Sequence, residues 1–184
     1  MSKAKIWLTP EAYIKMNTLV QGYSTEVGWH GLVERVADNQ YCVYDILVYP
    51  HFVSPATIIS DDINYSEWLM NLSDEDFDAL RFHGHSHVFM SPTPSGVDYQ
   101  FRKDLLSQTP EESDTFYIFF IINKRSNWTA QIYDYKTKQT YNTDDIEVAI
   151  CFSDGSSRSR WLKDSKKIAV RRSSSEFNKI TRLF

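Results

Sequence analysis

Histidines and an aspartate at short spacing are the residues of this chain best suited to chemistry. His85 and His87 are separated by one residue, and Asp98 follows His87 after ten intervening residues. On a strand, side chains two residues apart point to the same face, so one strand presents both imidazoles together. Imidazole and carboxylate groups bind zinc, and three protein ligands leave a fourth position open for water, as in catalytic zinc sites. The pattern therefore predicts a zinc site with one ion per chain.

Two further residues belong to this pattern. Ser95 precedes Asp98 by three residues, so both lie on one face of a helix, which the Ser95 hydroxyl is expected to cap with about 1 kcal/mol of stabilisation. His83 shares the strand face of His85 and His87, so spacing alone also allows His83 and His85 as the ligand pair.

The whole motif, His85-Ser86-His87, seven residues, Ser95, two residues and Asp98, resembles the signature of the JAB/MPN (JAMM) zinc metallopeptidases, a family also called Mov34/MPN/PAD-1-like. Its five fixed positions over fourteen residues are all present. The resemblance implies that His85, His87 and Asp98 are the zinc ligands, because the seven-residue count to Ser95 starts at His87. It also implies that Ser95 donates a hydrogen bond to the oxyanion of the tetrahedral intermediate.

The family's upstream glutamate would be Glu26, in the segment Ser24-Thr25-Glu26-Val27-Gly28-Trp29-His30-Gly31-Leu32. Its implied role is to take a proton from a zinc-activated water and hand it to the leaving amine. A half-buried glutamate paired with a lysine or arginine is the alternative. His83, His30 and Trp29 are expected either to line the substrate groove or support a ligand, or to serve in packing.

The resemblance implies a zinc-dependent isopeptidase or peptidase, a deubiquitinase-like hydrolase that cleaves after the C-terminal tail of a ubiquitin-like protein or its conjugate. The chain looks like the compact bacterial or phage members of the family. Alternatives are a catalytically silent MPN-type scaffold, a nucleic-acid-associated protein, and a phage or assembly peptidase with the same chemistry. The residues alone do not distinguish an isopeptide from a linear peptide bond, and they leave the modifier and the oligomeric state open.

Charge is unevenly distributed along the 184 residues. The net charge is −4, but the segment from Ser157 onward carries +7 and the remainder therefore carries −11. Such a basic, Ser-rich tail is compatible with a solvated extension, a strap on the acidic body or the chain's only nucleic-acid contact. Two widely separated cysteines, Cys42 and Cys151, favour free thiols, and the absence of a membrane-spanning run or leader favours a cytoplasmic protein with no membrane partner.

The elements needed to position the site are predicted from periodicity and capping signals. Residues 81–88 read as the histidine-bearing strand, and Ser95 begins a helix to about residue 106 with Val97, Phe101 and Leu105 as its buried stripe. Residues 116–122 form an apolar run typical of a central strand, and a further strand is expected over 140–152. Residues 52–64 read as an insertion, with substrate contact as one role.

Together these signals predict an α/β fold, a single layered domain with a mixed β-sheet flanked by helices, as in the MPN/JAB family. We expect the metallopeptidase domain to span residues 1–152, and residues 153–184 to form a basic C-terminal extension.

Overall fold

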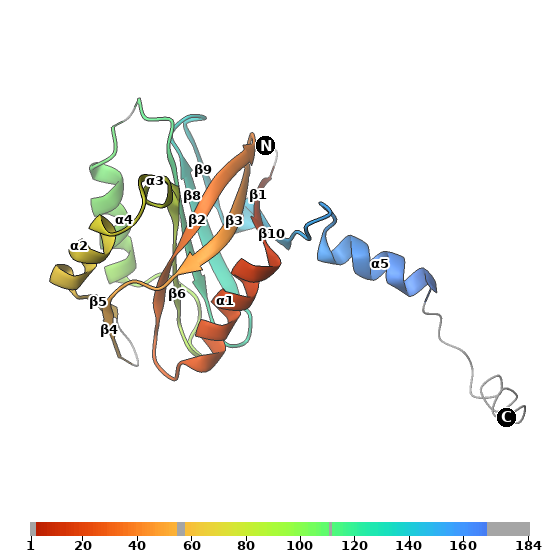
Figure 1. Ribbon diagram of the computed structural model, residues 1–184, viewed down its shortest axis with the longest axis horizontal. Coiled ribbons are helices and arrows are strands. Elements are labelled where there is room, and N and C mark those ends of the chain that lie inside the picture. The colour runs from red at the N-terminus through yellow and green to blue at the C-terminus, as the bar shows by residue number, and fades with distance from the viewer. Residues whose placement is uncertain (1–2, 55–57, 111, 169–184) are drawn as a thin grey trace, which may run out of the picture.

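The computed structural model describes residues 3–54, 58–110 and 112–168, which form an α/β structure built around one mixed sheet (Figure 1). In spatial order the strands of this eight-stranded sheet are β10 (Ile146–Ile150), β1 (Ala4–Leu8), β3 (Gln40–Leu47), β2 (Gly28–Ala37), β6 (Leu80–Ser86), β7 (Phe116–Ile122), β8 (Trp128–Asp134) and β9 (Gln139–Asn142). The pairs β10–β1, β1–β3 and β6–β7 are parallel and the others antiparallel, so the predicted mixed pairing is confirmed. A separate two-stranded sheet comprises β4 (His51–Val53) and β5 (Ile58–Ser60).

Helices flank the sheet, and most begin at a side-chain cap. They are α1 (Pro10–Gly22), α2 (Asp62–Met70), α3 (Asp74–Ala79), α4 (Gly96–Ser107) and α5 (Arg158–Ile168). The side chains of Thr9, Asp61, Ser73 and Ser95 accept backbone N–H groups at the starts of the first four helices. Helix α1 packs beside β1 and β3, whereas α2, α3 and α4 gather on the other side of the sheet (Figure 1).

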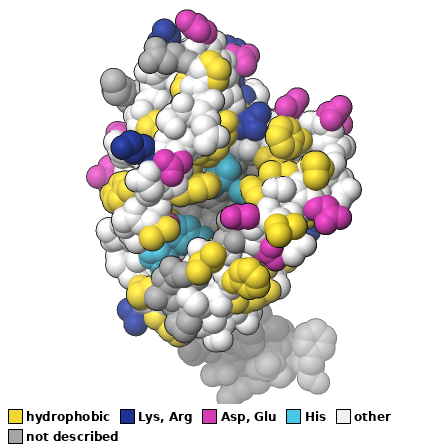
Figure 2. Space-filling model, turned by 90° about the vertical axis from the view of Figure 1, so that its left-hand side faces the viewer, with side chains coloured by type: hydrophobic (Ala, Val, Ile, Leu, Met, Phe, Trp, Pro, Cys, Tyr) yellow, Lys and Arg dark blue, Asp and Glu magenta, His cyan; other side chains and the backbone are white. Residues whose placement is uncertain are grey.

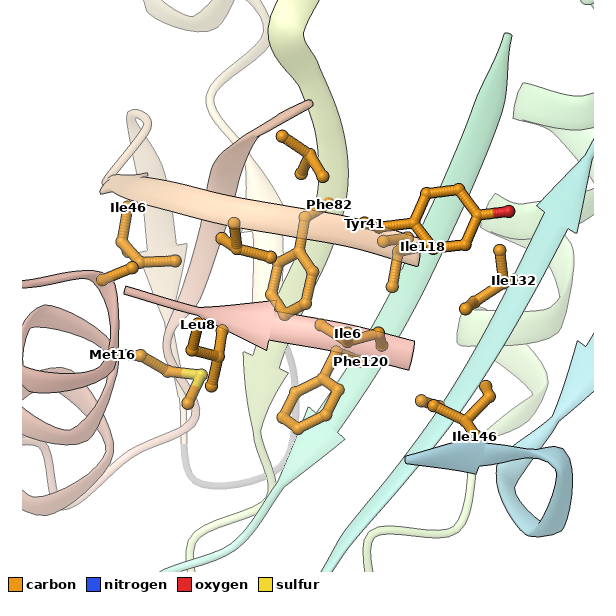
Figure 3. Close-up of a cluster of buried hydrophobic side chains, with 14 of the residues drawn as sticks. Ile6, Leu8, Met16, Tyr41, Ile46, Phe82, Ile118, Phe120, Ile132 and Ile146 are labelled. Carbon is orange, nitrogen blue, oxygen red and sulfur yellow. The ribbon is translucent and has the colours of Figure 1, made fainter. Parts of the chain in front are cut away.

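The sheet is curved, and its concave face encloses the hydrophobic core together with α1. Figure 3 shows Ile6 and Leu8 of β1 lying across from Phe82 of β6 and Phe120 of β7, with Met16 of α1 at one end. Each of these five side chains is at most 3% exposed. The concave face is thus fully packed, so a functional cavity has to form on the opposite face or at an end of the strands.

Two expectations for individual elements are wrong. The strand predicted over residues 140–152 is interrupted by a 3-10 turn, Thr143–Asp145, at which Asn142 and Asp145 form a capping box. The turn carries the chain from β9 at one edge of the sheet to β10 at the other.

In α4 the predicted apolar stripe is not buried. Val97 is 66% exposed and Phe101 48% exposed, whereas the buried residue of this helix is Arg102. Helix α4 therefore buries the arginine Arg102 against the sheet, whereas the sequence pattern predicted that apolar side chains would be buried there.

The C-terminal extension begins with a helix. In α5 the basic residues Lys166 and Lys167 occupy the last turn, and Trp161 packs edge-on against Phe152. Helix α5 projects away from the sheet (Figure 1). The rest of the basic tail, 169–184, lies outside the described residues, and the division at residue 152 remains a prediction. No helix in the described part of the chain is long and apolar enough to cross a membrane. Cys42 and Cys151 are both half-buried free thiols.

Candidate metal centre

Two neighbouring antiparallel strands carry the candidate residues as a ladder of cross-strand pairs. In the β2–β6 register Gly28 faces His85 and His30 faces His83. Glu26, two residues before Gly28, and His87, two residues after His85, lie just beyond this register, and Oε1 of Glu26 is 3.9 Å from Nε2 of His87. Because side chains two residues apart share a face, Glu26, His87, His85, His83 and His30 all lie on one side of the sheet. The predicted common face of the three strand histidines is confirmed.

Ser86, the residue between the two histidines, holds this end of the ladder together. Its hydroxyl accepts a hydrogen bond from the Val27 N–H at 3.1 Å, and its own N–H donates to the Val27 carbonyl at 3.0 Å. Ser86 is 1% exposed. The two bonds fix the backbone that follows Glu26 against the backbone that bears His85 and His87.

The ligand atoms of His85, His87 and Asp98 converge. The two histidine Nε2 atoms are 3.0 Å apart, and the Nε2 of His85 lies 3.2 Å from Oδ1 of Asp98. The Nε2 of His87 lies 4.0 Å from Oδ2 of Asp98, and the three ligand atoms all lie within 4.8 Å of one another. Zinc bonds of about 2.0–2.1 Å in tetrahedral geometry place ligand atoms about 3.3 Å apart. The donor set and its spacing therefore fit a zinc ion.

The loop between His87 and Ser95 is held by backbone carbonyls that accept side-chain hydrogen bonds. Nδ1 of His87 donates to the Ser91 carbonyl at 2.7 Å, Asn123 Nδ2 to the Met90 carbonyl at 2.9 Å, and Thr129 Oγ1 to the Pro92 carbonyl at 2.5 Å. Because a carbonyl can only accept, the proton of His87 sits on Nδ1, and Nε2 presents its lone pair to the cluster. The loop thus both returns the chain to the site and orients a ligand.

Ser95 and Asp98 form a capping box at the start of α4. The Asp98 carboxylate accepts from both the N–H and the hydroxyl of Ser95 through Oδ2, each at 2.6 Å, and the Asp98 N–H donates to the Ser95 hydroxyl at 3.3 Å. The predicted cap is confirmed. It leaves Oδ1 of Asp98 facing His85, so one carboxylate oxygen orients the helix start and the other faces the cluster.

Glu26 lies beside the ligands and is 5% exposed. Its Oε1 is 3.9 Å from Nε2 of His87. Burial raises the pKa of this carboxyl, the nearby Asp98 charge raises it further, and His87 opposes both. A carboxyl with a raised pKa that reaches the cluster is suited to accepting and releasing a proton. The alternative pairing of Glu26 with a lysine or arginine does not occur among the ion pairs of the described residues.

His83 and His30 lie next to the cluster but are not part of it. The His30 ring stacks on Tyr49 at 4.5 Å and meets His83 edge-on at 4.8 Å, and its Nε2 is 3.0 Å from the Tyr65 hydroxyl. Both nitrogens of His83 and Nδ1 of His30 are buried without a hydrogen-bond partner. Burial lowers the pKa of His30 to about 3 and that of His83 well below its usual range, so both rings are neutral.

Because side chains alternate along β2, Trp29 points to the core face of the sheet, where it is fully buried with its indole next to Gly84. A Cβ on Gly84 would lie 2.2 Å from the indole nitrogen of Trp29, and a Cβ on Gly28 would lie 2.4 Å from the Tyr49 hydroxyl. Both positions flank His85 in the ladder. Glycine is required at these two places because a neighbouring aromatic side chain occupies the volume of the missing side chain.

Sequence reasoning missed three residues of the site. His51 accepts the Gly28 N–H through Nε2 at 3.1 Å and donates through Nδ1 to the Tyr49 carbonyl at 2.6 Å, which anchors the start of β2. Tyr49 walls the cavity, and Arg102 lies in its lining. Neither His51 nor Tyr49 belongs to a spacing motif, and Arg102 was hidden by the apolar pattern of α4.

The cluster opens into a cavity of about 500 Å³. It extends from Glu26, His87 and Asp98 past His85 to His83 and His30, and α4 and the loop after β6 supply the remaining walls. Figure 2, which views this face, shows histidine side chains within a hollow bordered by hydrophobic and acidic side chains. The lining residues Val97 and Phe101 are large apolar side chains that are also exposed.

No family model matches the chain, and no curated protein matches it. Among solved structures, it is similar to protein DSY2949 from Desulfitobacterium hafniense, known from a solution structure. The match has a TM-score of 0.51 and 18% sequence identity, and it covers 81% of this chain and 96% of the other. At this identity the likeness concerns the fold alone, and the chain shares an α/β arrangement with that protein.

Proposed function

We propose that this protein is a zinc-dependent peptidase or isopeptidase of the JAMM type with an MPN/JAB-like fold. One observation carries the proposal. The Nε2 atoms of His85 and His87 and the Asp98 carboxylate lie at the mutual distances of zinc ligands, and the buried Glu26 carboxyl is 3.9 Å from His87. Three ligands with an adjacent carboxyl are the parts that metal-assisted hydrolysis of an amide requires.

The ion and the protein have separate tasks in this chemistry. When bound, zinc supplies Lewis acidity, which activates a water molecule and polarises the scissile carbonyl. Glu26 accepts the proton of the attacking water and passes it to the leaving amine. A group that both accepts and releases a proton works best when its pKa lies near the working pH, and burial raises the pKa of Glu26 in that direction.

Ser95 has a structural task and a proposed catalytic one. Its hydroxyl donates to Asp98, so it caps α4 and orients a ligand at the same time. To donate to a developing oxyanion, the hydroxyl must rotate away from Asp98, whose Oδ2 still accepts the Ser95 N–H. Loss of such a donor lowers the rate by about 100- to 1000-fold.

The proposed substrate is the extended C-terminal tail of a ubiquitin-like protein. The two-stranded sheet of β4 and β5 lies beside the cavity: Ile58 lines it, and the Ser54 carbonyl accepts the Glu26 N–H at 3.0 Å. An extended tail can add to the edge of such a sheet through backbone hydrogen bonds. This gives the 52–64 insertion a role in holding substrate.

The proposal is tested by separating metal binding from proton transfer. Glu26→Gln should keep stoichiometric zinc and lower the hydrolysis of ubiquitin-like fusion proteins by about 100- to 10,000-fold, the usual range for a general base. Glu34→Gln, an exposed position on β2, the strand that follows Glu26, is the matched control and should behave as wild type. Hydrolysis by Glu26→Gln at the wild-type rate would refute the assigned proton carrier.

Metal binding is tested on α4. Asp98→Asn should release zinc, measured by elemental analysis after gel filtration, while Asp104→Asn on the exposed side of the same helix should retain it. Equal zinc content in both variants would remove Asp98 from the ligand set. Stoichiometric zinc without hydrolysis of any ubiquitin-like fusion would instead favour a silent scaffold.

A further inference from the structure

Arg102 is a buried cation on the wall of the candidate active-site cavity. It is 7% exposed, and it is the one Lys or Arg among the described residues that line this cavity. Its guanidinium lies over the ring of Phe119 at 5.2 Å and over that of Tyr99 at 5.7 Å, and it donates to Gln131 at 3.1 Å. These contacts hold the side chain in place without neutralising its charge.

Among the described residues no carboxylate forms a direct ion pair with this charge, and the Asp98 carboxylate acts on it only from beyond ion-pair distance. Arg102 takes part in none of the ion pairs, with nitrogen–oxygen distances up to 4.0 Å, that occur among residues 3–54, 58–110 and 112–168. The carboxylates in the cavity lining are Glu26 and Asp98, and Asp98 is already engaged by Ser95 and His85. A buried charge without a partner is unfavourable, so an unpaired guanidinium in a cavity indicates a site that a ligand completes.

The surroundings of Arg102 restrict the charge and type of that ligand. Phe119 contacts both Arg102 and His83, and the His83 ring stacks on its phenyl group at 5.6 Å. Both nitrogens of His83 and Nδ1 of His30 lack hydrogen-bond partners, so this end of the cavity offers neutral polar groups and one positive charge. A single guanidinium balances one negative charge, which suits a carboxylate better than a phosphate near −2.

We propose that Arg102 binds a carboxylate of the substrate close to the scissile bond, so that the enzyme selects acidic segments. The inference rests on the proposed peptidase function and adds a specificity-determining residue to it. The carboxylate is either an acidic side chain before or after the scissile bond or a free C-terminal carboxylate. Planar N–H pairs of arginine match each of these groups in a bidentate manner.

The experiment compares isosteric substrates that differ only in charge. Peptides carry Glu or Gln at the residue before the scissile bond, Glu or Gln at the residue after it, or a C-terminal carboxylate or amide. Zinc-loaded wild type should prefer the acid of at least one pair by about 10- to 100-fold in kcat/KM. The pair that shows the preference identifies the source of the carboxylate.

Variants then assign the preference to Arg102. Arg102→Gln should cleave the acid and amide members of each pair equally, so that the ratio of their kcat/KM values falls to about 1. Arg102→Lys, which keeps the charge but not the planar donor pair, should retain part of the preference. Lys103→Gln, at the exposed neighbouring position, is the matched control and should retain all of it. If Arg102→Gln instead lowered kcat/KM by the same factor for the acid and the amide peptide of a pair, Arg102 would serve only in packing.

A binding measurement separates this inference from the proposed function. Calorimetric titration of the Glu26→Gln variant with the same peptides reports affinity without turnover. Hydrolysis without any acid preference in rate or affinity would overturn the role of Arg102 and leave the peptidase intact. Tighter binding of the acid peptides that Arg102→Gln abolishes, with no hydrolysis by wild type, would support the carboxylate site and overturn the proposed function.

Discussion

Replacing Ser86 by alanine tests whether the residue between the two histidines positions Glu26, the proposed proton carrier. The substitution removes one oxygen atom from a site that is 1% exposed. The Val27 N–H then loses its acceptor, while the Ser86 N–H still donates to the Val27 carbonyl. An unsatisfied buried N–H costs about 1–3 kcal/mol. For a protein of this size, about 2–4 °C per kcal/mol gives a fall of about 2–12 °C in the unfolding temperature.

The expected effect on function is selective. His85 and His87 keep their strand, and the tautomer of His87 is fixed by Ser91, so zinc content should remain at wild-type level. Glu26 loses part of the clamp that sets its distance to the cluster, so kcat should fall while zinc stays bound.

Differential scanning calorimetry, zinc analysis and kinetics on one preparation measure all three quantities. Ser91→Ala is the control because its exposed hydroxyl contacts only Thr93, whereas its carbonyl still accepts from His87. An unchanged unfolding temperature would refute the energetic argument. A lower temperature with an unchanged kcat per bound zinc would refute the positioning argument.

Two further predictions concern packing and charge. Gly84→Ala places a methyl group 2.2 Å from the buried Trp29 indole and should lower the free energy of unfolding, measured by urea denaturation, by about 1–3 kcal/mol. Zinc binding should also weaken, because the strand must shift to relieve the clash. A wild-type free energy of unfolding together with wild-type zinc affinity would contradict this packing. Asp134→Asn leaves Arg35 without its buried carboxylate and should cost about 3 kcal/mol at pH 7, measured on metal-free protein. Burial raises the pKa of Asp134, but hydrogen bonds from Arg35, Tyr41 and the Thr137 N–H outweigh burial and lower it, so the wild type loses this stabilisation as the pH falls below about 4. The gap between variant and wild type should therefore narrow at pH 3, and a constant gap would contradict this assignment.

Strand periodicity was enough to place part of the site. His83, His85 and His87 alternate along one strand, and the structure has them on one face as expected. The helix start at Ser95 was also predictable, because a serine with an acidic residue three positions later is a local capping signal. Both predictions depend only on contacts within a few residues.

The position of Glu26 beside His87 depends on a strand register that no local signal specifies. Shifting β2 by one residue against β6 would turn Glu26 toward the core and leave the cluster without its proposed proton carrier. In the structure the glycines help to set the register. The Trp29 indole occupies the space beside Gly84, and the Tyr49 ring occupies the space beside Gly28. A shifted pairing would bring a residue with a side chain to each of these positions, where it would clash with the ring.

Helix α4 shows the limit of periodicity. Val97, Phe101 and Leu105 recur at helical spacing, which ordinarily marks a buried face. Two of them are instead exposed near the cavity mouth, and Arg102 is buried between aromatic rings. A helix that covers a cavity need not bury its apolar stripe, because at that point the space between the helix and the sheet is a cavity that side chains do not fill. Amphipathic pattern alone cannot distinguish a packed core from such a cavity.

In the proposed zinc site, the choice of ligands among the three strand histidines also depends on residues outside the strand. His83 meets the face of Phe119 at 5.6 Å and the edge of Phe101 at 5.5 Å, and both of its nitrogens are closed off from solvent. His85 and His87 instead face the Asp98 carboxylate. A divalent cation that leaves water needs an anionic ligand as well as lone pairs, so the proposed ion would be stabilised beside Asp98, in the first turn of α4, and not at His83. In this proposal the loop that returns the chain from His87 to Ser95 selects the histidine pair, and burial lowers the pKa of His83 and keeps its ring neutral.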